Sequence, residues 1–120
     1  MPIRAVRGAT QVSDDARDTL MAAVSELLEA ILERNTFGAD DLISIIFTAT
    51  DDLRADFPAY AVRSAGITDV PLLCARELAV DGAMPRVVRV LAHVETTQTR
   101  QEIRHVYLNG AAALRTDLPQ

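Results

Sequence analysis

An arginine inside an apolar run is the residue of this sequence with the clearest chemical meaning. Arg89 stands in the middle of the segment VVRVL at residues 87–91, and β-branched runs of this kind are typical of strands that are largely buried. A guanidinium group keeps its proton, so a buried arginine has to meet a carboxylate, several neutral acceptors or an anionic ligand. From this segment alone, a structural ion pair with Glu77 or Glu95 and an anion-binding role are equally open.

Further polar side chains in apolar surroundings are candidates for chemistry. They are Arg7, Cys74, Glu77, His93, His105 and Tyr107. Zinc needs three or four Cys, His or carboxylate ligands, and the paired CxxC or HxxxH spacing of such sites is missing here, so we expect no metal. An activated Cys–His pair is conceivable, but a lone cysteine of this kind is more often a small hydrophobic residue. The two arginines, the tyrosine and the nearby glutamate instead suit a small dianionic ligand that carries a hydroxyl group.

Composition and charge narrow the class of protein. The chain has 120 residues, 49% of them hydrophobic and 24% charged, which predicts one globular domain over residues 1–120 rather than disorder. The net charge is −5 and no basic cluster is interleaved with aromatic residues, so we expect no nucleic-acid partner. All twelve basic residues are arginines. Nucleotide bias is the simpler explanation, yet any anion site here must use guanidinium groups.

The sequence also predicts where the protein acts. No apolar run reaches the length of a membrane span, and the first ten residues, MPIRAVRGAT, are too short and too polar for a secretory signal. The single cysteine, Cys74, cannot form an internal disulfide, which fits a reducing compartment. We therefore expect a cytoplasmic protein with no membrane partner.

The elements that must position these side chains begin with a strand and a long helix. Residues 3–9 alternate as a strand does. Ser13 and the two acids after it predict a helix start, and apolar residues then recur at the helical period to about Arg34. Residues 42–49 are apolar on both sides of the alternation, which predicts a central strand covered on both faces. Because the chain has one long helix, which covers one face of the sheet, another subunit could cover the other face.

The second half of the chain is predicted to hold a short helix and the remaining strands. We expect two helical turns at 59–65 ending at Gly66, strands at 70–73 and 86–95, a single turn at 101–104, and a strand at 105–115 with a bend at Gly110. Five strands with one long and one short helix make an α+β domain. Such a domain has one poorly covered sheet face, which oligomerisation can cover.

Short motifs spread along the chain resemble the AroH class of monofunctional chorismate mutases. They are RGAT at 7–10, ATxDL at 49–53 with FPA at 57–59, VP at 70–71 leading to CxxE at 74–77, RV at 89–90, IRHVYL at 103–108 and LR at 114–115. The resemblance is collinear over essentially the whole chain. It implies a mixed five-stranded sheet and a homotrimeric pseudo-α/β-barrel with an active site in each cleft between neighbours. It also implies isomerisation of chorismate to prephenate by a Claisen rearrangement in the shikimate pathway, without cofactor, metal or covalent intermediate.

The resemblance assigns roles to particular residues. Arg89 would face the ether oxygen, on which negative charge grows in the transition state. Arg7 would hold a carboxylate, with Tyr107 donating a further hydrogen bond. Glu77 would accept from the ring hydroxyl and, with Cys74, hold the allylic cation side. Apolar walls would come from Phe57, Leu73 and Leu114, and added positive potential from Arg63 and Arg115.

Some positions depart from the pattern of the family. Tyr60 stands where the resemblance implies a lysine, Leu72 and Leu73 are more apolar than expected, and Thr116 replaces a proline. The main alternative is a trimeric module of related architecture that binds a small carboxylate without rearranging it. A deaminase of reactive imines on a similar trimer is a third possibility.

Overall fold

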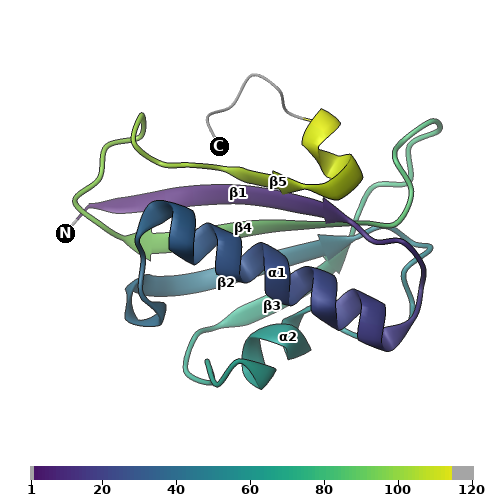
Figure 1. Ribbon diagram of the computed structural model, residues 1–120, viewed down its shortest axis with the longest axis horizontal. Coiled ribbons are helices and arrows are strands. Elements are labelled where there is room, and N and C mark those ends of the chain that lie inside the picture. The colour runs from purple at the N-terminus through teal and green to yellow at the C-terminus, as the bar shows by residue number, and fades with distance from the viewer. Residues whose placement is uncertain (1, 115–120) are drawn as a thin grey trace.

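The computed structural model describes residues 2–114, which form a five-stranded sheet with helices against one of its faces (Figure 1). The elements are β1 (Ile3–Gln11), α1 (Arg17–Asn35), the 3-10 helix η1 (Ala39–Asp41), β2 (Leu42–Ala49), α2 (Ala59–Ser64), β3 (Leu72–Arg76), β4 (Val87–Glu95), β5 (Val106–Leu108) and the 3-10 helix η2 (Asn109–Ala113). The strand order is β3-β2-β4-β1-β5. The central strand β4 is antiparallel to β1 and β2, whereas β3 and β5 run parallel to their neighbours. The predicted α+β fold with a mixed five-stranded sheet is confirmed.

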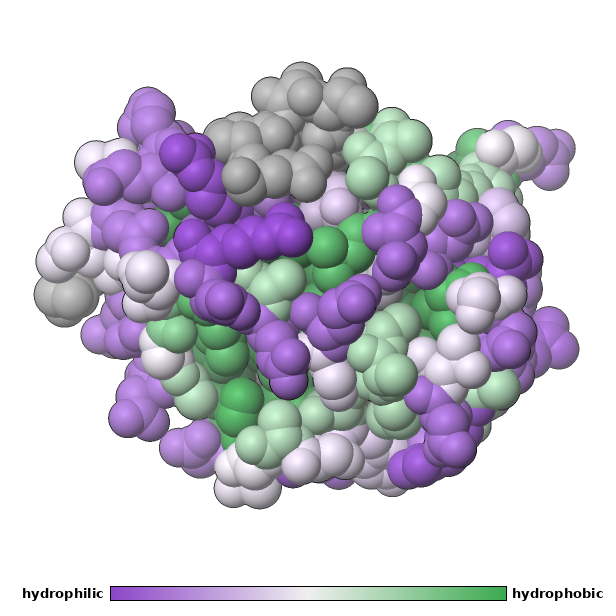
Figure 2. Space-filling view, viewed as in Figure 1, coloured by the Kyte–Doolittle hydropathy of each residue, from purple (hydrophilic) through white to green (hydrophobic). Residues whose placement is uncertain are grey.

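The core lies between α1 and the sheet. Apolar side chains recur along α1 at the helical period and pack against alternate residues of the strands. The fully buried members of this layer include Leu20, Leu27 and Ile31 from the helix and Val6, Ile45, Phe47 and Val88 from the sheet. Figure 2 shows hydrophilic side chains spread over the face that α1 covers, with smaller apolar areas between them. No helix within residues 2–114 is long and apolar enough to cross a membrane.

Gly8 allows α1 to approach the sheet closely. A Cβ atom at this position would lie 3.0 Å from the Val106 carbonyl oxygen, 3.0 Å from Val90 Cγ1 and 3.2 Å from Ile31 Cδ1. Because backbone and two core side chains converge there, a larger residue would push the helix and β5 away from β1. Gly8 therefore lets α1, β4 and β5 pack closely against β1, the strand that also carries Arg7.

The second face of the sheet is much less covered by the described chain. On β1, β2 and β3 this face presents Ala5, Arg7, Ile46 and Leu73, which are exposed or half-buried, and Leu73 is 59% exposed. Residues 2–114 close one end of this face, where Ala9, Val87, Tyr107 and Ala111 pack with Met84 and Leu114. A sheet face left partly open by residues 2–114 agrees with the sequence-based expectation.

The predicted start of the long helix is wrong. The helix begins at Arg17, its N-cap residue is Ala16, and no side chain caps it. The acids before it serve another purpose, because Asp15 Oδ1 accepts hydrogen bonds from the backbone N–H groups of Arg54 at 2.9 Å and Ala55 at 3.0 Å. Residues that looked like a helix cap therefore tie the chain before α1 to the loop before α2.

The predicted strand at 105–115 is also wrong beyond Leu108. Asn109 takes a left-handed conformation with φ of 56°, which ends the strand and turns the chain into η2, so Gly110 lies in a 3-10 helix rather than in a strand bend. The strand expected at 70–73 is shifted to Leu72–Arg76. The turn expected at 101–104 lies at residues 100–102. Arg115 and Thr116 lie outside the described residues.

Candidate active site

Sheet register brings three polar side chains into one row on the open face. Thr48 of β2 pairs with Arg89 of β4, Arg89 pairs with Ala9 of β1, and Ala9 pairs with Tyr107 of β5. Directly paired residues on neighbouring strands point to the same side of a sheet. Thr48, Arg89 and Tyr107 therefore lie side by side across β2, β4, β1 and β5, although they come from distant parts of the chain.

Arg89 forms an ion pair with Glu77. Its Nε atom donates to Glu77 Oε1 at 2.7 Å, and Thr48 Oγ1 donates to Glu77 Oε2 at 3.1 Å. The backbone N–H of Glu77 donates to the Ala49 carbonyl at 3.0 Å, which fixes the residue just beyond β3. The Arg89 side chain is 37% exposed and that of Glu77 18%, so the pair lies at the surface of the open face rather than inside the core.

The sequence left two roles open for Arg89, a structural ion pair and the binding of an anionic ligand, and this geometry is compatible with both. Of the two carboxylates proposed as partners, Glu77 is the one bound, whereas Glu95 lies exposed at the end of β4. The ion pair uses Nε, and within residues 2–114 no protein group binds the two terminal nitrogens of the guanidinium group. A guanidinium carries five N–H donors in a fixed plane, so the ion pair orients Arg89 and leaves donors for a ligand.

Arg7 and Tyr107 extend the row on the same face. Arg7 is exposed on β1, two residues before Ala9, and its backbone N–H donates to His105 Nδ1 at 3.0 Å. Tyr107 is only 4% exposed, because η2 and Leu114 close over that end of the sheet. We name the side chains of Arg7, Thr48, Glu77, Arg89 and Tyr107 the strand cluster.

A second group of predicted residues surrounds a cavity at the β3 edge of the sheet. The cavity has a volume of about 350 Å³ and is lined by Phe57, Ala59, Tyr60, Arg63, Leu72, Leu73 and Cys74, which we name the edge pocket. Phe57 packs edge-on against Tyr60, with ring centroids 5.8 Å apart and an interplanar angle of 84°. Arg63 Cζ lies 5.5 Å from the centroid of the Tyr60 ring. Aromatic and aliphatic walls with one cation suit an apolar ligand that bears a carboxylate.

The described chain does not bring all the predicted residues together. Cys74 pairs with Phe47 and packs against the core beneath α1, on the opposite face of the sheet from Arg89. Its thiol is free and half-buried, and it lines the edge pocket rather than the strand cluster. Leu114 packs beside Tyr107, and Arg115 lies outside the described residues. One chain therefore presents two separate groups of site residues.

Two residues that matter to these groups were not predicted as site residues. Thr48 binds Glu77, and its only signal in the sequence is a hydroxyl group in a mostly apolar strand. Tyr60 was noted only as a departure from the family pattern, yet it contacts both Phe57 and Arg63. Both contacts depend on tertiary geometry that spacing along the chain does not give.

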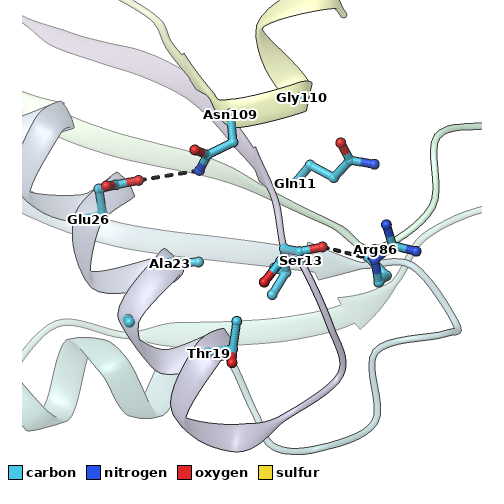
Figure 3. Close-up of a pocket in the computed structure, with 10 residues that line it drawn as sticks. Gln11, Ser13, Thr19, Ala23, Glu26, Arg86, Asn109 and Gly110 are labelled. Atoms are coloured by element: carbon cyan, nitrogen blue, oxygen red, sulfur yellow. Dashed lines mark hydrogen bonds between the residues drawn. The ribbon is translucent and has the colours of Figure 1, made fainter.

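A larger cavity lies elsewhere, between α1, the end of β1 and η2, and none of the predicted site residues lines it (Figure 3). Four of its polar side chains, those of Gln11, Glu26, Arg86 and Asn109, bind to another side chain or to backbone. Asn109 Nδ2 donates to Thr10 Oγ1 at 3.0 Å and to Glu26 Oε1 at 3.4 Å, and Arg86 Nε donates to the Val12 carbonyl at 2.9 Å. These bonds hold strand ends in place. No group of three His, Cys, Asp or Glu side chains in the described part of the chain could hold a metal ion.

Comparisons with known proteins agree on one family. The family model described as chorismate mutase type I matches residues 3–118. The chain is 45% identical to chorismate mutase AroH of Thermus thermophilus over 117 residues, which cover 97% of this chain and 96% of that protein. It is 40% identical to chorismate mutase AroH of Bacillus subtilis (strain 168) over 119 residues, or 98% and 94% of the two chains. The structure of a chorismate mutase from Clostridium thermocellum superposes with a TM-score of 0.90 at 46% identity, covering 92% of this chain and 98% of that chain.

Proposed function

The chain belongs to the type I chorismate mutase family, and we infer from this that it isomerises chorismate to prephenate in aromatic amino acid biosynthesis. The observation that carries the inference is the match of the family over residues 3–118. It is supported by a guanidinium group that an ion pair orients on an exposed sheet face. The chain is thus an isomerase.

We propose that Arg89 stabilises the transition state of this rearrangement. In a Claisen rearrangement the ether C–O bond breaks while a new C–C bond forms, and negative charge grows on the ether oxygen before the new bond is complete. A cation that is already oriented interacts more strongly with this charge than with the neutral ether, so it lowers the barrier rather than only tightening substrate binding. The bond from Arg89 Nε to Glu77 supports this role, because it fixes the direction of the remaining donors.

Glu77, Arg7 and Tyr107 are proposed to hold the rest of the substrate. Both oxygens of Glu77 already accept one hydrogen bond each, but an ionised carboxylate offers about four lone-pair sites and can still accept from the ring hydroxyl of chorismate. The exposed Arg7 is suited to bind a substrate carboxylate, and Tyr107 to donate a further bond. Fixing both ends of the substrate also favours the compact conformer from which the new bond forms.

We further propose that a complete site needs two copies of the chain, in a homotrimer. The strand cluster and the edge pocket lie at different places on one chain, so an edge pocket that faces the strand cluster of a neighbour would unite them. Exposed apolar side chains support such contacts, with Phe57 62%, Leu73 59% and Ile3 58% exposed in the single chain. Phe57, Leu73, Cys74 and Arg63 would then come from one chain, and Leu114 and Arg115 would border the strand cluster of the other.

The remaining expectations complete the proposal. We propose one domain over residues 1–120, no cofactor, no nucleic-acid or membrane partner, and a cytoplasmic location. The reaction is a redistribution of electrons within one molecule, so it requires no proton transfer. The histidines are accordingly given no part in the chemistry.

The test is to follow the conjugated-diene absorbance of chorismate after adding the purified protein in the presence of EDTA. We expect saturable loss of absorbance and prephenate as the only product, identified by chromatography against a standard. If absorbance stays constant while chorismate still raises the melting temperature, the protein binds its ligand without rearranging it. In that case the carboxylate-binding module replaces the enzyme.

A further inference from the structure

In the edge pocket, Phe57 contacts Tyr60, and Tyr60 in turn contacts the guanidinium group of Arg63. Arg63 lies three residues after Tyr60 on α2, and its Cζ is 5.5 Å from the ring centroid of Tyr60. A guanidinium group within about 6 Å of an aromatic ring centroid is attracted by the ring quadrupole. Residues three apart on a helix are neighbours on its surface. The Tyr60 ring therefore restricts where the Arg63 guanidinium group can lie.

Tyr60 is itself held by its surroundings. Phe57 packs edge-on against it, and the backbone N–H of Phe57 donates to Asp56 Oδ1 at 2.7 Å. The other oxygen of Asp56 accepts from Arg17 Nε of α1, also at 2.7 Å. The buried residues Ala61 and Val62 pack α2 into the core, and the contacts of Asp56 connect the residue before Phe57 to α1.

The charge of Arg63 is available to a ligand. Within residues 2–114 no carboxylate forms an ion pair with Arg63, and its guanidinium group contacts the Tyr60 ring. The walls beside it are the apolar Leu72 and Leu73. A cation next to such walls attracts an anion more strongly than one fully surrounded by water.

We infer that Tyr60 is a positioning residue, whose ring holds the Arg63 guanidinium group at the edge pocket so that Arg63 binds a carboxylate of the substrate. This inference rests on the proposed function and adds to it. The ring does the positioning, and the hydroxyl group of Tyr60 takes no part. The arrangement affects substrate capture rather than the bond rearrangement, since the developing charge is assigned to Arg89.

The inference predicts a specific pattern of kinetic constants. Replacing the ring, in Tyr60→Leu, should raise KM for chorismate about three- to tenfold, the range expected for losing a cation–π contact at a partly exposed site, with kcat changed less than about twofold. Arg63→Ala should raise KM at least as much. The double variant Tyr60→Leu/Arg63→Ala should match Arg63→Ala, because the ring acts only through Arg63.

Conservative and charge-matched variants separate this role from others. Tyr60→Phe should restore KM to within about twofold of the wild-type value, because the ring remains. Arg34→Ala, which removes an exposed arginine from the last turn of α1, should leave KM unchanged and so control for the change in net charge. Circular dichroism melts should show that every variant folds, since Tyr60 is 38% exposed.

Three outcomes would overturn the inference. A wild-type KM in Tyr60→Leu would show that Arg63 needs no support from the ring. An effect of Tyr60→Phe equal to that of Tyr60→Leu would assign the role to the hydroxyl group. Additive effects in the double variant would mean that Tyr60 contacts the substrate independently. Failure of the proposed function is distinct from all three, because it would appear as absent turnover in the wild-type protein.

Discussion

The strand cluster and the edge pocket are held in place by different means. Arg89 and Tyr107 lie on strands whose backbone is fixed by hydrogen bonds to their neighbours, and Glu77 is bound through both its carboxylate and its backbone. One wall of the edge pocket also lies on a paired strand, β3, but the wall with Phe57, Tyr60 and Arg63 comes from a six-residue helix and the loop before it, where exposed side chains contact one another. The difference suits separate roles, in which the rigid strand cluster stabilises the transition state and the more adaptable edge pocket binds the substrate. Changes in the strand cluster should therefore lower kcat, and changes in the edge pocket should raise KM.

The largest effect should follow from Arg89→Ala. The change removes a full charge as well as its donors, and loss of one oriented donor at a developing charge typically costs about 100- to 1000-fold in rate. We expect kcat to fall by at least about 100-fold, measured by the loss of chorismate absorbance at saturating substrate. Arg89→Lys keeps the charge but loses the planar guanidinium group, so its kcat should lie between those of the wild type and Arg89→Ala. If Arg89→Ala kept more than about a tenth of the wild-type turnover, the role given to Arg89 would be wrong.

The next effect concerns whether the two regions meet between chains. Arg89→Ala disables the strand cluster, and Leu73→Trp, at a position that lines the edge pocket and is 59% exposed, should block the pocket by filling it. Each variant alone should be nearly inactive. After joint unfolding and refolding of an equal mixture, about a quarter of the sites in a symmetric oligomer should combine two intact halves, so turnover should rise well above the sum of the separate variants.

The mixing experiment has a matched control. A mixture of Arg89→Ala and Arg7→Ala should stay inactive. Both residues lie on the same face of one chain, so neither variant supplies an intact strand cluster. A mixture of Arg89→Ala and Leu73→Trp that stayed inactive, although sedimentation showed mixed oligomers, would mean that each site is built from a single chain.

A smaller effect should follow from Thr48→Val. Valine keeps the shape of threonine but cannot donate to Glu77, so the carboxylate loses one of its two side-chain partners. One hydrogen bond of this kind is worth about 1 kcal/mol, so we expect kcat to fall about fivefold. KM should change little, and Thr48→Ser should retain most of the activity. A rise in KM with kcat preserved would mean that Thr48 contributes to substrate binding, and would contradict the assignment of the strand cluster to kcat.

The smallest effect should come from a residue outside both regions. The backbone N–H of Thr99 donates to the Glu102 carboxylate at 2.9 Å, and this bond, followed by one from the Thr99 side chain, lowers the pKa of Glu102 below its ordinary value. A carboxylate with a lowered pKa in the folded state adds stability above its unfolded pKa, and this stability is lost as the pH falls through the folded pKa. Glu102→Gln should thus melt slightly lower than wild type at neutral pH, with a difference that shrinks in acid. Both kcat and KM should stay unchanged, and a difference in melting temperature that grew in acid would contradict the assignment.

Much of the fold could be predicted because its signals are local. Residues 42–49 are mostly apolar on both sides of the alternation and form a strand with the predicted bounds, and the apolar period of α1 indicates which side of the helix faces the sheet. The two main errors have different causes, since the strand at 105–115 ends early at the left-handed Asn109, whereas the helix start was misplaced because a side chain binds distant backbone. Asp15 resembles part of a helix cap in the sequence, yet its carboxylate binds a loop about forty residues away in the chain.

The candidate site was only partly predictable for a similar reason. An apolar run around Arg89 indicated that the charge needs a partner, and Glu77 was one of two carboxylates considered. The register that sets Thr48 and Tyr107 beside Arg89 depends on how four strands pair, which periodicity within one strand cannot give. The contact between Tyr60 and Arg63 fits their spacing of three residues, but its meaning depends on the cavity that both line.

The position of β1 between β4 and β5 has a consequence for the order in which the protein can assemble. β1 is synthesised long before these strands, yet Ile3 pairs with Glu95 and Gly8 pairs with Val106. On a ribosome, α1 and the segment that carries Tyr60 and Arg63 emerge while β1 still lacks both of its neighbours. The row containing Arg89 and Tyr107 can form only once β4 and β5 have left the exit tunnel, so the proposed catalytic side chains of a nascent chain come together after α1 and the segment with Tyr60 and Arg63 have already emerged.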